Sequence, residues 1–259
     1  MHALAFDDVF AALEALPLCT QDLVRPRLKE TWLAYLQCVL ESRTVRDAAA
    51  VTGVHRTTSF RWRHRFISGA IHERAPTLSA IVEADETYLL ESQKGSRTLD
   101  RPARKRGGVA RRRGINRDHA CLLVARDRSG QTLDFHTGRG PVTAAQLERC
   151  LRPVLAPDVL LVSDAAQAYK TFAARAGITH EAVNLRARIR TRGAIHLQNV
   201  NGWHSRFKTW LLCFRGVASR YLIDYSGWQR ILDDKRLTTP ALLLRAAVQF
   251  GKRLDRKRN

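Results

Sequence analysis

The chain has 259 residues, of which 45% are hydrophobic and 26% charged, enough to bury one core and a small accessory domain. Its 44 lysines and arginines outnumber 24 acidic residues, which gives a formal net charge of +20. A surplus this large predicts a polyanionic partner, because each phosphate that a basic side chain neutralises releases condensed counterions. Nucleic acid is the first candidate and an acidic membrane surface the second.

Two further classes of protein are excluded by composition. The five cysteines contain no C-x-x-C pair, so they indicate reduced core residues rather than a zinc ribbon or a disulfide framework. No uncharged apolar run approaches the roughly 18 residues that a membrane span needs. We therefore expect a soluble, cytoplasmic protein that does not interact with membranes.

The N-terminal part predicts helices and a helix-turn-helix. Apolar positions in 28–40 recur at helical spacing, and 43–67 has the pattern of two short helices joined by a turn. Thr44 is placed to cap the first, Gly53 supplies the left-handed turn, and Phe60 is expected to face inward on the second. A plain helical hairpin has the same pattern, but the bases lie mainly on the second helix, which favours major-groove binding. The side chains expected to face outward are those of His55, Arg56, Thr57, Ser59, Arg61, Arg63 and Arg65.

The periodicity then changes to that of an α/β domain. Strands are predicted at 78–88, 119–126, 131–136 and 158–163, and helices at 143–155 and 165–176. Hairpin strands followed by a crossover helix and a buried strand predict a mixed sheet flanked by helices. The expected domains are a helical region over 1–70, a catalytic domain over 76–235, and a C-terminal helix with a basic tail over 236–259.

A basic insert separates the first two predicted strands. Residues 94–117 contain ten lysines and arginines against a single acid, Asp100. A loop of this length inside a compact domain is functional or a solvated flexible insert, and its composition favours phosphate contact. The candidate contacts are Lys105, Arg106, Arg111, Arg112 and Arg113.

Two aspartates are the first candidates for chemistry. Asp85 lies in the middle of a predicted strand, where a buried carboxylate is costly unless it meets a cation or a donor. Strand alternation places Glu83, Asp85 and Thr87 on one face and Glu86 on the other. Asp164 directly follows an apolar strand, a common position for catalytic carboxylates, although a helix cap would use the same residue.

A third element faces this pair. Asn201, His204, Ser205 and Lys208 share one face of a helix whose other side is aromatic. Two aspartates opposite such a helix predict a two-metal phosphoryl-transfer site. Oxygen ligands favour two Mg²⁺ ions, with Mn²⁺ as a substitute.

The chain resembles the IS1595 group of insertion-sequence transposases, of the ISXO2-like type. The resemblance rests on the phrases VEADETY, LLVSDAAQAYKTFAARAGITH and HLQNVNGWHSRFKTWLLCFRGVASRYLIDYSGW and covers roughly residues 25–232. It implies a ribonuclease-H-like fold and DNA strand cleavage followed by strand transfer. It also implies that Asp85 and Asp164 bind metal, that Asn201 occupies the third acidic position, and that Lys208 is the family's helical lysine.

Two departures from the family pattern bear on activity. Asn201 stands where most such transposases have glutamate; asparagine is an accepted version in this group, but a neutral amide is a weaker cation ligand. Members often begin with a four-cysteine zinc ribbon, which this sequence does not contain. Either the chain starts late or this copy dispenses with the ribbon, so recognition of the element's ends stays open.

Other polar residues near the predicted site have two interpretations. His204 is an auxiliary metal ligand or proton shuttle, or a helix-surface histidine that bonds to backbone or phosphate, and the second is favoured. Arg186, Arg188, Arg190 and Arg192, which alternate before the helix, form a solvated edge or a path for DNA, and the DNA path is favoured.

The leading hypothesis is a transposase that acts on double-stranded DNA as a homo-oligomer, associated with a prokaryotic nucleoid. Water would first free a 3′ end, and that 3′ hydroxyl would then attack target DNA. The alternatives are a domesticated or inactive transposase that only binds DNA through its helix-turn-helix, and a ribonuclease-H-like nuclease without strand transfer.

Overall fold

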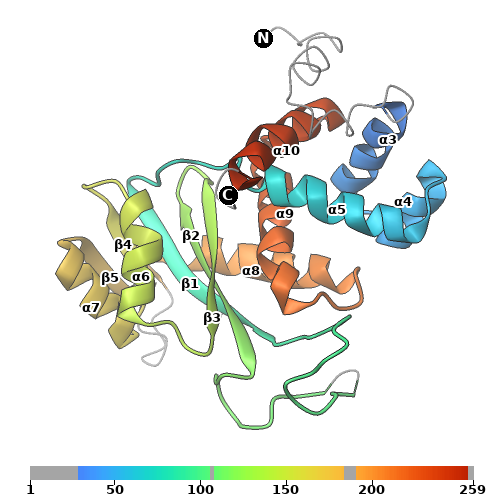
Figure 1. The fold of residues 1–259 in the computed structure, drawn as a ribbon. Coiled ribbons are helices and arrows are strands. Elements are labelled where there is room, and N and C mark those ends of the chain that lie inside the picture. The colour runs from blue at the N-terminus through green and yellow to red at the C-terminus, as the bar shows by residue number, and fades with distance from the viewer. Residues whose placement is uncertain (1–28, 106–107, 184–190, 256–259) are drawn as a thin grey trace, which may run out of the picture. The chain divides into compact units, whose positions relative to one another are not determined.

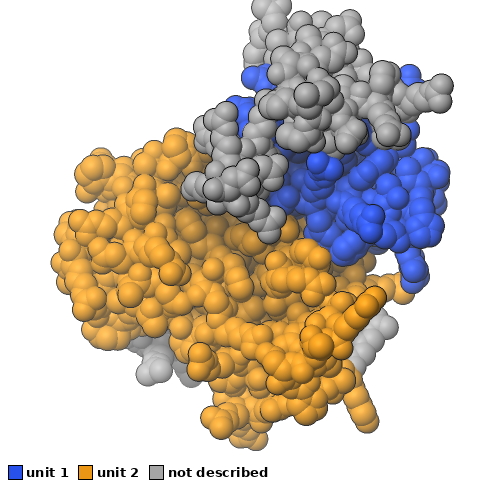
Figure 2. Space-filling view, in the orientation of Figure 1, with its two compact units in different colours: residues 1–73, 227–259 blue, residues 74–226 orange. Residues whose placement is uncertain are grey.

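The computed structural model describes residues 29–105, 108–183 and 191–255, and the chain divides into two compact units (Figures 1 and 2). The helical unit combines the chain up to residue 73 with the chain from residue 227 onward. The sheet unit comprises residues 74–226. Within the described ranges, no helix has the length and apolar character required to cross a membrane.

The described part of the helical unit begins with α3 (Lys29–Leu40), α4 (Val45–Thr52) and α5 (Arg56–Ala70). Thr44 caps α4 in a capping box with Asp47, and Gly53 ends that helix in the left-handed conformation with φ 66°. The predicted helical pair and its turn are therefore confirmed.

The buried face of α5 differs from the one that its apolar residues predicted. Ser59 and Arg63 are 0% exposed, whereas Phe60 is 41% exposed. The Ser59 hydroxyl donates to the carbonyl of Val45 at 2.8 Å, and the Arg63 guanidinium lies 5.0 Å from the ring centroid of Trp228. The prediction that Ser59 and Arg63 face DNA is wrong, because these contacts hold both polar side chains inside the unit.

The C-terminal helix α10 (Pro240–Asp255) belongs to the helical unit, where it packs on α3 and α5. A Cβ atom on Gly69 would lie 2.2 Å from the carbonyl oxygen of Ala247, so only glycine permits this approach of α5 to α10. In α9 (Leu222–Asp234), the Trp228 indole N–H donates to the carbonyl of Val39 at 3.1 Å. The ends of the described chain thus meet in one unit, whereas the sequence predicted a separate C-terminal element.

The sheet unit is built on five strands in the order β3-β2-β1-β4-β5. The first three pair antiparallel, and β4 and β5 run parallel to β1. Their bounds are β1 Ile81–Leu90, β2 His119–Asp127, β3 Thr132–Arg139, β4 Leu160–Asp164 and β5 Thr179–Val183. The predicted mixed sheet is confirmed; β5, whose sequence THEAV has no clear alternation, was not predicted.

Helices cover the two faces of this sheet (Figure 1). On one face, α6 (Ala144–Leu151), followed by the short helix Arg152–Val154, and α7 (Gln167–Ala176) enclose an apolar core with the sheet. On the other face, α8 (Gln198–Leu212) packs against β1 and β2. The remaining elements are β6 Thr191–Arg192, β7 Ile195–His196 and the short helix Ser219–Tyr221.

Candidate active site

The two predicted aspartates lie on neighbouring parallel strands. The register pairs Glu83 of β1 with Val162 of β4, and Asp85 and Asp164 each follow this last paired position by two residues. The charge of Asp164 contributes to raising the pKa of Asp85, so the two carboxylates are near enough to act on one another. One oxygen of Asp164 accepts the backbone N–H of Ala166 at 3.0 Å, and therefore Asp164 also fixes the turn that leads into α7.

Helix α8 places its polar face beside Asp85. Trp203 and Phe207 are fully buried, with ring centroids 5.2 Å apart, and they hold the aromatic side of the helix inside the unit. His204 Nδ1 lies 3.9 Å from a carboxylate oxygen of Asp85. Lys208 follows one turn later, is exposed, and lies close enough for its charge to lower the pKa of Asp85. The structure thus brings Asp85, Asp164, His204 and Lys208 together.

Asn201 is less closely engaged than the other predicted residues. It lies in the first turn of α8, three residues before His204, and its side chain is exposed. Its amide makes no hydrogen bond with any described residue, and so it remains available to a ligand.

The site carries more negative charge than its surroundings compensate. Burial, reinforced by the charges of Glu86 and Asp164, raises the pKa of Asp85 to about 7. Burial, with a smaller contribution from Lys208, lowers the pKa of His204 to about 3, so this imidazole is neutral. Because His204 is neutral and the Lys208 ammonium is exposed to solvent, a divalent cation would supply the counter-charge that the two carboxylates need.

His204 is buried, contrary to the interpretation of a helix-surface histidine. It is 6% exposed, and its Nε2 has no hydrogen-bond partner among the described residues. A strand on one side and the aromatic rings of its own helix explain why helical periodicity alone did not reveal this burial.

The donor set is suited to a hard cation. Within the described ranges, no group of three or more His, Cys, Asp or Glu side chains converges on one point. The candidate ligands are instead two carboxylates, Asp85 and Asp164, and the amide oxygen of Asn201. Oxygen donors of this kind fit Mg²⁺, which keeps several water molecules and needs few protein ligands.

A fully buried carboxylate that the sequence did not single out secures α8. Glu83 accepts the backbone N–H of Val200 at 3.0 Å and the side-chain amide of Asn199 at 3.0 Å, and it pairs with Arg128. These bonds tie the first turn of α8 to β1, two residues from Asp85. The sequence held one indication of this role: strand alternation places Glu83 on the same face as Asp85, the face that α8 covers.

Glu86 points to the opposite face, as strand alternation predicted. Its carboxylate accepts hydrogen bonds from the hydroxyls of Tyr169 and Tyr88. Burial raises the pKa of Glu86, and its charge in turn raises the pKa of Asp85.

The predicted DNA-contacting residues have different positions. Arg56, Thr57 and Arg61 are exposed on α5, as is His55, which caps this helix, and Lys105, Arg111, Arg112 and Arg113 are exposed on the insert. Ser59 and Arg63 are buried. Arg106, Arg186, Arg188 and Arg190 lie outside the described residues.

The class of this mixed-sheet domain is given by its sequence, which is that of a transposase domain. A family model for the ISXO2-like transposase domain matches residues 77–228, more than half of the chain. The chain therefore belongs to the ISXO2-like transposase family. Its sheet, with the strand order β3-β2-β1-β4-β5 and helices on both faces, agrees with the ribonuclease-H-like fold that the resemblance implied.

Solved structures similar to this chain include two Mos1 assemblies. A pre-cleavage Mos1 transpososome has 13% sequence identity and a TM-score of 0.23, covering 83% of this chain and 78% of that chain. The Mos1 Strand Transfer Complex has 16% identity and a TM-score of 0.23, covering 78% and 75%. No curated protein sequence matches the chain.

Proposed function

We propose that this transposase-family chain cleaves DNA strands and transfers them to a target, as a metal-dependent enzyme of an insertion sequence. The observation that carries the proposal is the pair Asp85 and Asp164 on neighbouring strands, with the polar face of α8 beside Asp85. In this reaction water first attacks a phosphodiester to free a 3′ hydroxyl. That hydroxyl then attacks a phosphodiester of the target: a new P–O3′ bond forms, the target's own P–O3′ bond breaks, and one target strand leaves with a free 3′ hydroxyl.

Each residue has a separate role in the proposal. Asp85, Asp164 and Asn201 would hold two Mg²⁺ ions, or Mn²⁺, which supply activation of the attacking oxygen and stabilisation of the leaving one. Lys208, exposed one turn beyond His204, contacts the phosphate next to the scissile bond. His204 orients the Asp85 carboxylate from its buried position and acts as an auxiliary group.

Double-stranded DNA is the proposed partner, both as transposon ends and as target. The exposed side chains of α5 would enter the major groove, and the basic insert would contact phosphates. Arg106, Arg186, Arg188 and Arg190 are proposed as further contacts, and the active form as a homo-oligomer on paired ends.

The test is a nicking and joining assay on a labelled duplex that carries the ends of the encoding element. Wild type is expected to nick and join it with Mg²⁺, whereas Asp85→Asn and Asp164→Asn are expected to lose both reactions. Asp158→Asn is the matched control, because Asp158 is an exposed acid of the same unit outside the site. Equal activity of wild type and both site variants would refute the catalytic proposal.

The neutral amide at position 201 keeps a binding-only protein as the second candidate. Asn201→Ala is expected to abolish nicking while duplex affinity stays unchanged. A wild-type chain that binds the ends but never nicks them would favour the domesticated protein, and nicking without joined products would favour a simple nuclease.

A further inference from the structure

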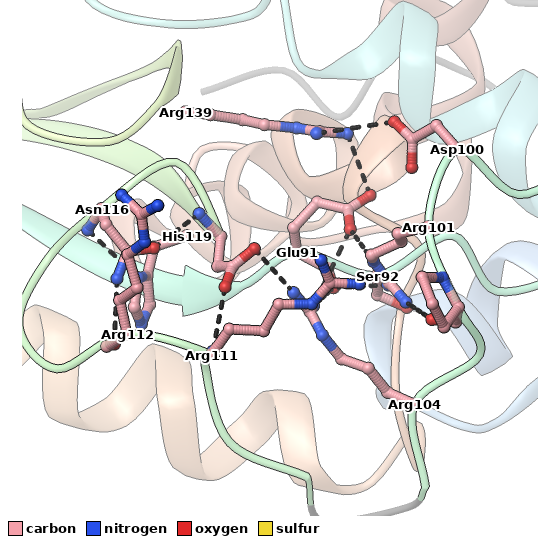
Figure 3. A network of polar contacts seen from close by, with 12 residues as sticks. Glu91, Ser92, Asp100, Arg101, Arg104, Arg111, Arg112, Asn116, His119 and Arg139 are labelled. Atoms are coloured by element: carbon pink, nitrogen blue, oxygen red, sulfur yellow. Dashed lines mark hydrogen bonds and ion pairs between the residues drawn. The ribbon is translucent and has the colours of Figure 1, made fainter.

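The insert between β1 and β2 is anchored on one buried carboxylate. Glu91, which directly follows β1, is 5% exposed. Its carboxylate pairs with Arg101 at 3.0 Å, Arg139 at 3.2 Å and Arg104 at 3.8 Å, and its carbonyl accepts the Arg104 guanidinium at 2.6 Å (Figure 3). Asp118 continues the network, since it pairs with Arg104 at 3.1 Å and accepts the backbone N–H of Arg111 at 3.0 Å.

This network forms the wall of a basic cavity. The cavity has a volume of about 600 Å³, and its lining includes Arg101, Arg111, Arg117 and Arg139 with Asp100 and Asp118. Among the described residues, the guanidinium groups of Arg111 and Arg117 form no ion pair within 4.0 Å. The cavity thus holds two arginines that are fixed by acids and two that are not.

The charges of the cavity and its wall do not balance. Five guanidinium groups, those of Arg101, Arg104, Arg111, Arg117 and Arg139, face the three carboxylates of Glu91, Asp100 and Asp118. An excess of two positive charges remains, and it is concentrated where the guanidinium groups are not paired. A group with one or two negative charges and several acceptor oxygens fits this arrangement, because guanidinium forks bind such oxygens in pairs.

We propose that this cavity, the insert pocket, binds a phosphate of duplex DNA. The inference rests on the proposed function for its choice of DNA, but the pocket is separate from the carboxylate site. Glu91 follows Asp85 by six residues along an extended strand, which is roughly 20 Å at about 3.3 Å per residue. A duplex aligned with β1 spans that distance in about six base pairs, at 3.4 Å per phosphate along one strand. The pocket would therefore hold a phosphate, of either strand, about six base pairs along the duplex axis from the scissile bond.

The first experiment measures how duplex affinity depends on salt, with the full chain in EDTA so that no cleavage occurs. The double variant Arg111→Ala/Arg117→Ala is compared with Arg152→Ala/Arg175→Ala, which removes the same charge from exposed positions of the sheet unit outside the pocket. Loss of one phosphate contact lowers the slope of log affinity against log salt by about 0.9, so the pocket variant should fall by about one. The control should keep a slope close to that of wild type. Identical slopes for the two double variants would overturn the proposal.

A second experiment locates the phosphate. Duplexes carry one uncharged methylphosphonate at successive positions, and others carry or lack a terminal 5′ phosphate. The affinity of wild type for the duplex should fall when one particular phosphate is replaced, and the affinity of the pocket variant should not change at that position. Sensitivity to the 5′ phosphate would identify a strand end, and sensitivity within the strand an internal phosphodiester. No position that distinguishes the two proteins would refute the pocket, whereas failure of Mg²⁺-dependent nicking bears only on the carboxylate site.

Discussion

Replacement of Glu83 by alanine is expected to release the first turn of α8. The side chain is 0% exposed, and its partner Arg128 is 25% exposed, so the substitution leaves a partly buried guanidinium without its carboxylate. It also removes the acceptor for the N–H of Val200. Removing one partner of a buried ion pair lowers stability by about 3–5 kcal/mol. Because Arg128 is partly exposed, we expect a loss at the lower end of this range, about 3 kcal/mol.

Hydrogen exchange measured on peptides of α8 tests this magnitude. A loss of about 3 kcal/mol corresponds to roughly 100-fold faster exchange, provided that the amides of α8 exchange by this opening. Glu148→Ala is the matched control, because its pair with Arg152 is exposed and exposed pairs contribute at most about 1 kcal/mol. Nicking should fall with Glu83→Ala, since Asn201 and Lys208 lose their position. Exchange in α8 no faster than in the Glu148 variant would refute the role of Glu83.

Three further predictions concern stability. Gly69→Ala should destabilise the helical unit by about 1–3 kcal/mol in urea unfolding, because the new Cβ meets the backbone of Ala247 at 2.2 Å. Gly202→Ala is the control: its Cβ meets only the flexible end of an arginine at 3.4 Å, so this substitution should not destabilise the protein. Thr44→Ala should lower the free energy of unfolding, measured by thermal denaturation, by about 1 kcal/mol, because the N-cap of α4 is lost. Burial raises the pKa of Asp85 from its ordinary value of 3.8 to about 7, so the unfolded chain releases this proton first as the pH rises. Its contribution to stability is therefore full below pH 4 and is lost toward pH 7 in metal-free protein. Asp85→Asn should gain stability relative to wild type over that range; a constant difference would contradict the raised pKa.

The sequence predicted those elements whose signals are local. The cap at Thr44, the turn at Gly53 and the alternation around Asp85 depend on neighbours along the chain, and the structure confirms each. The orientation of α5 was wrong because Ser59 and Arg63 are held by residues distant in sequence, which no periodicity records.

The candidate site shows the same division. Spacing placed His204 and Lys208 on one helical face, and the strand order then set that face beside Asp85. The role of Glu83 could not be predicted, because its partners in the first turn of α8 are more than a hundred residues away. The insert was correctly identified as basic, but its anchoring on Glu91 depends on three arginines from two segments.

The helical unit is formed by two segments of the chain, one before and one after the sheet unit in the sequence. This arrangement sets an order of events during synthesis. Helices α3, α4 and α5 leave the ribosome first, but α10, which packs on α3 and α5, is made only after residues 74–226. Domains of a growing chain fold largely as units, so the continuous sheet unit can finish before the helical unit has all its parts. A nascent or prematurely terminated chain would hold the carboxylate site without a completed helix-turn-helix unit.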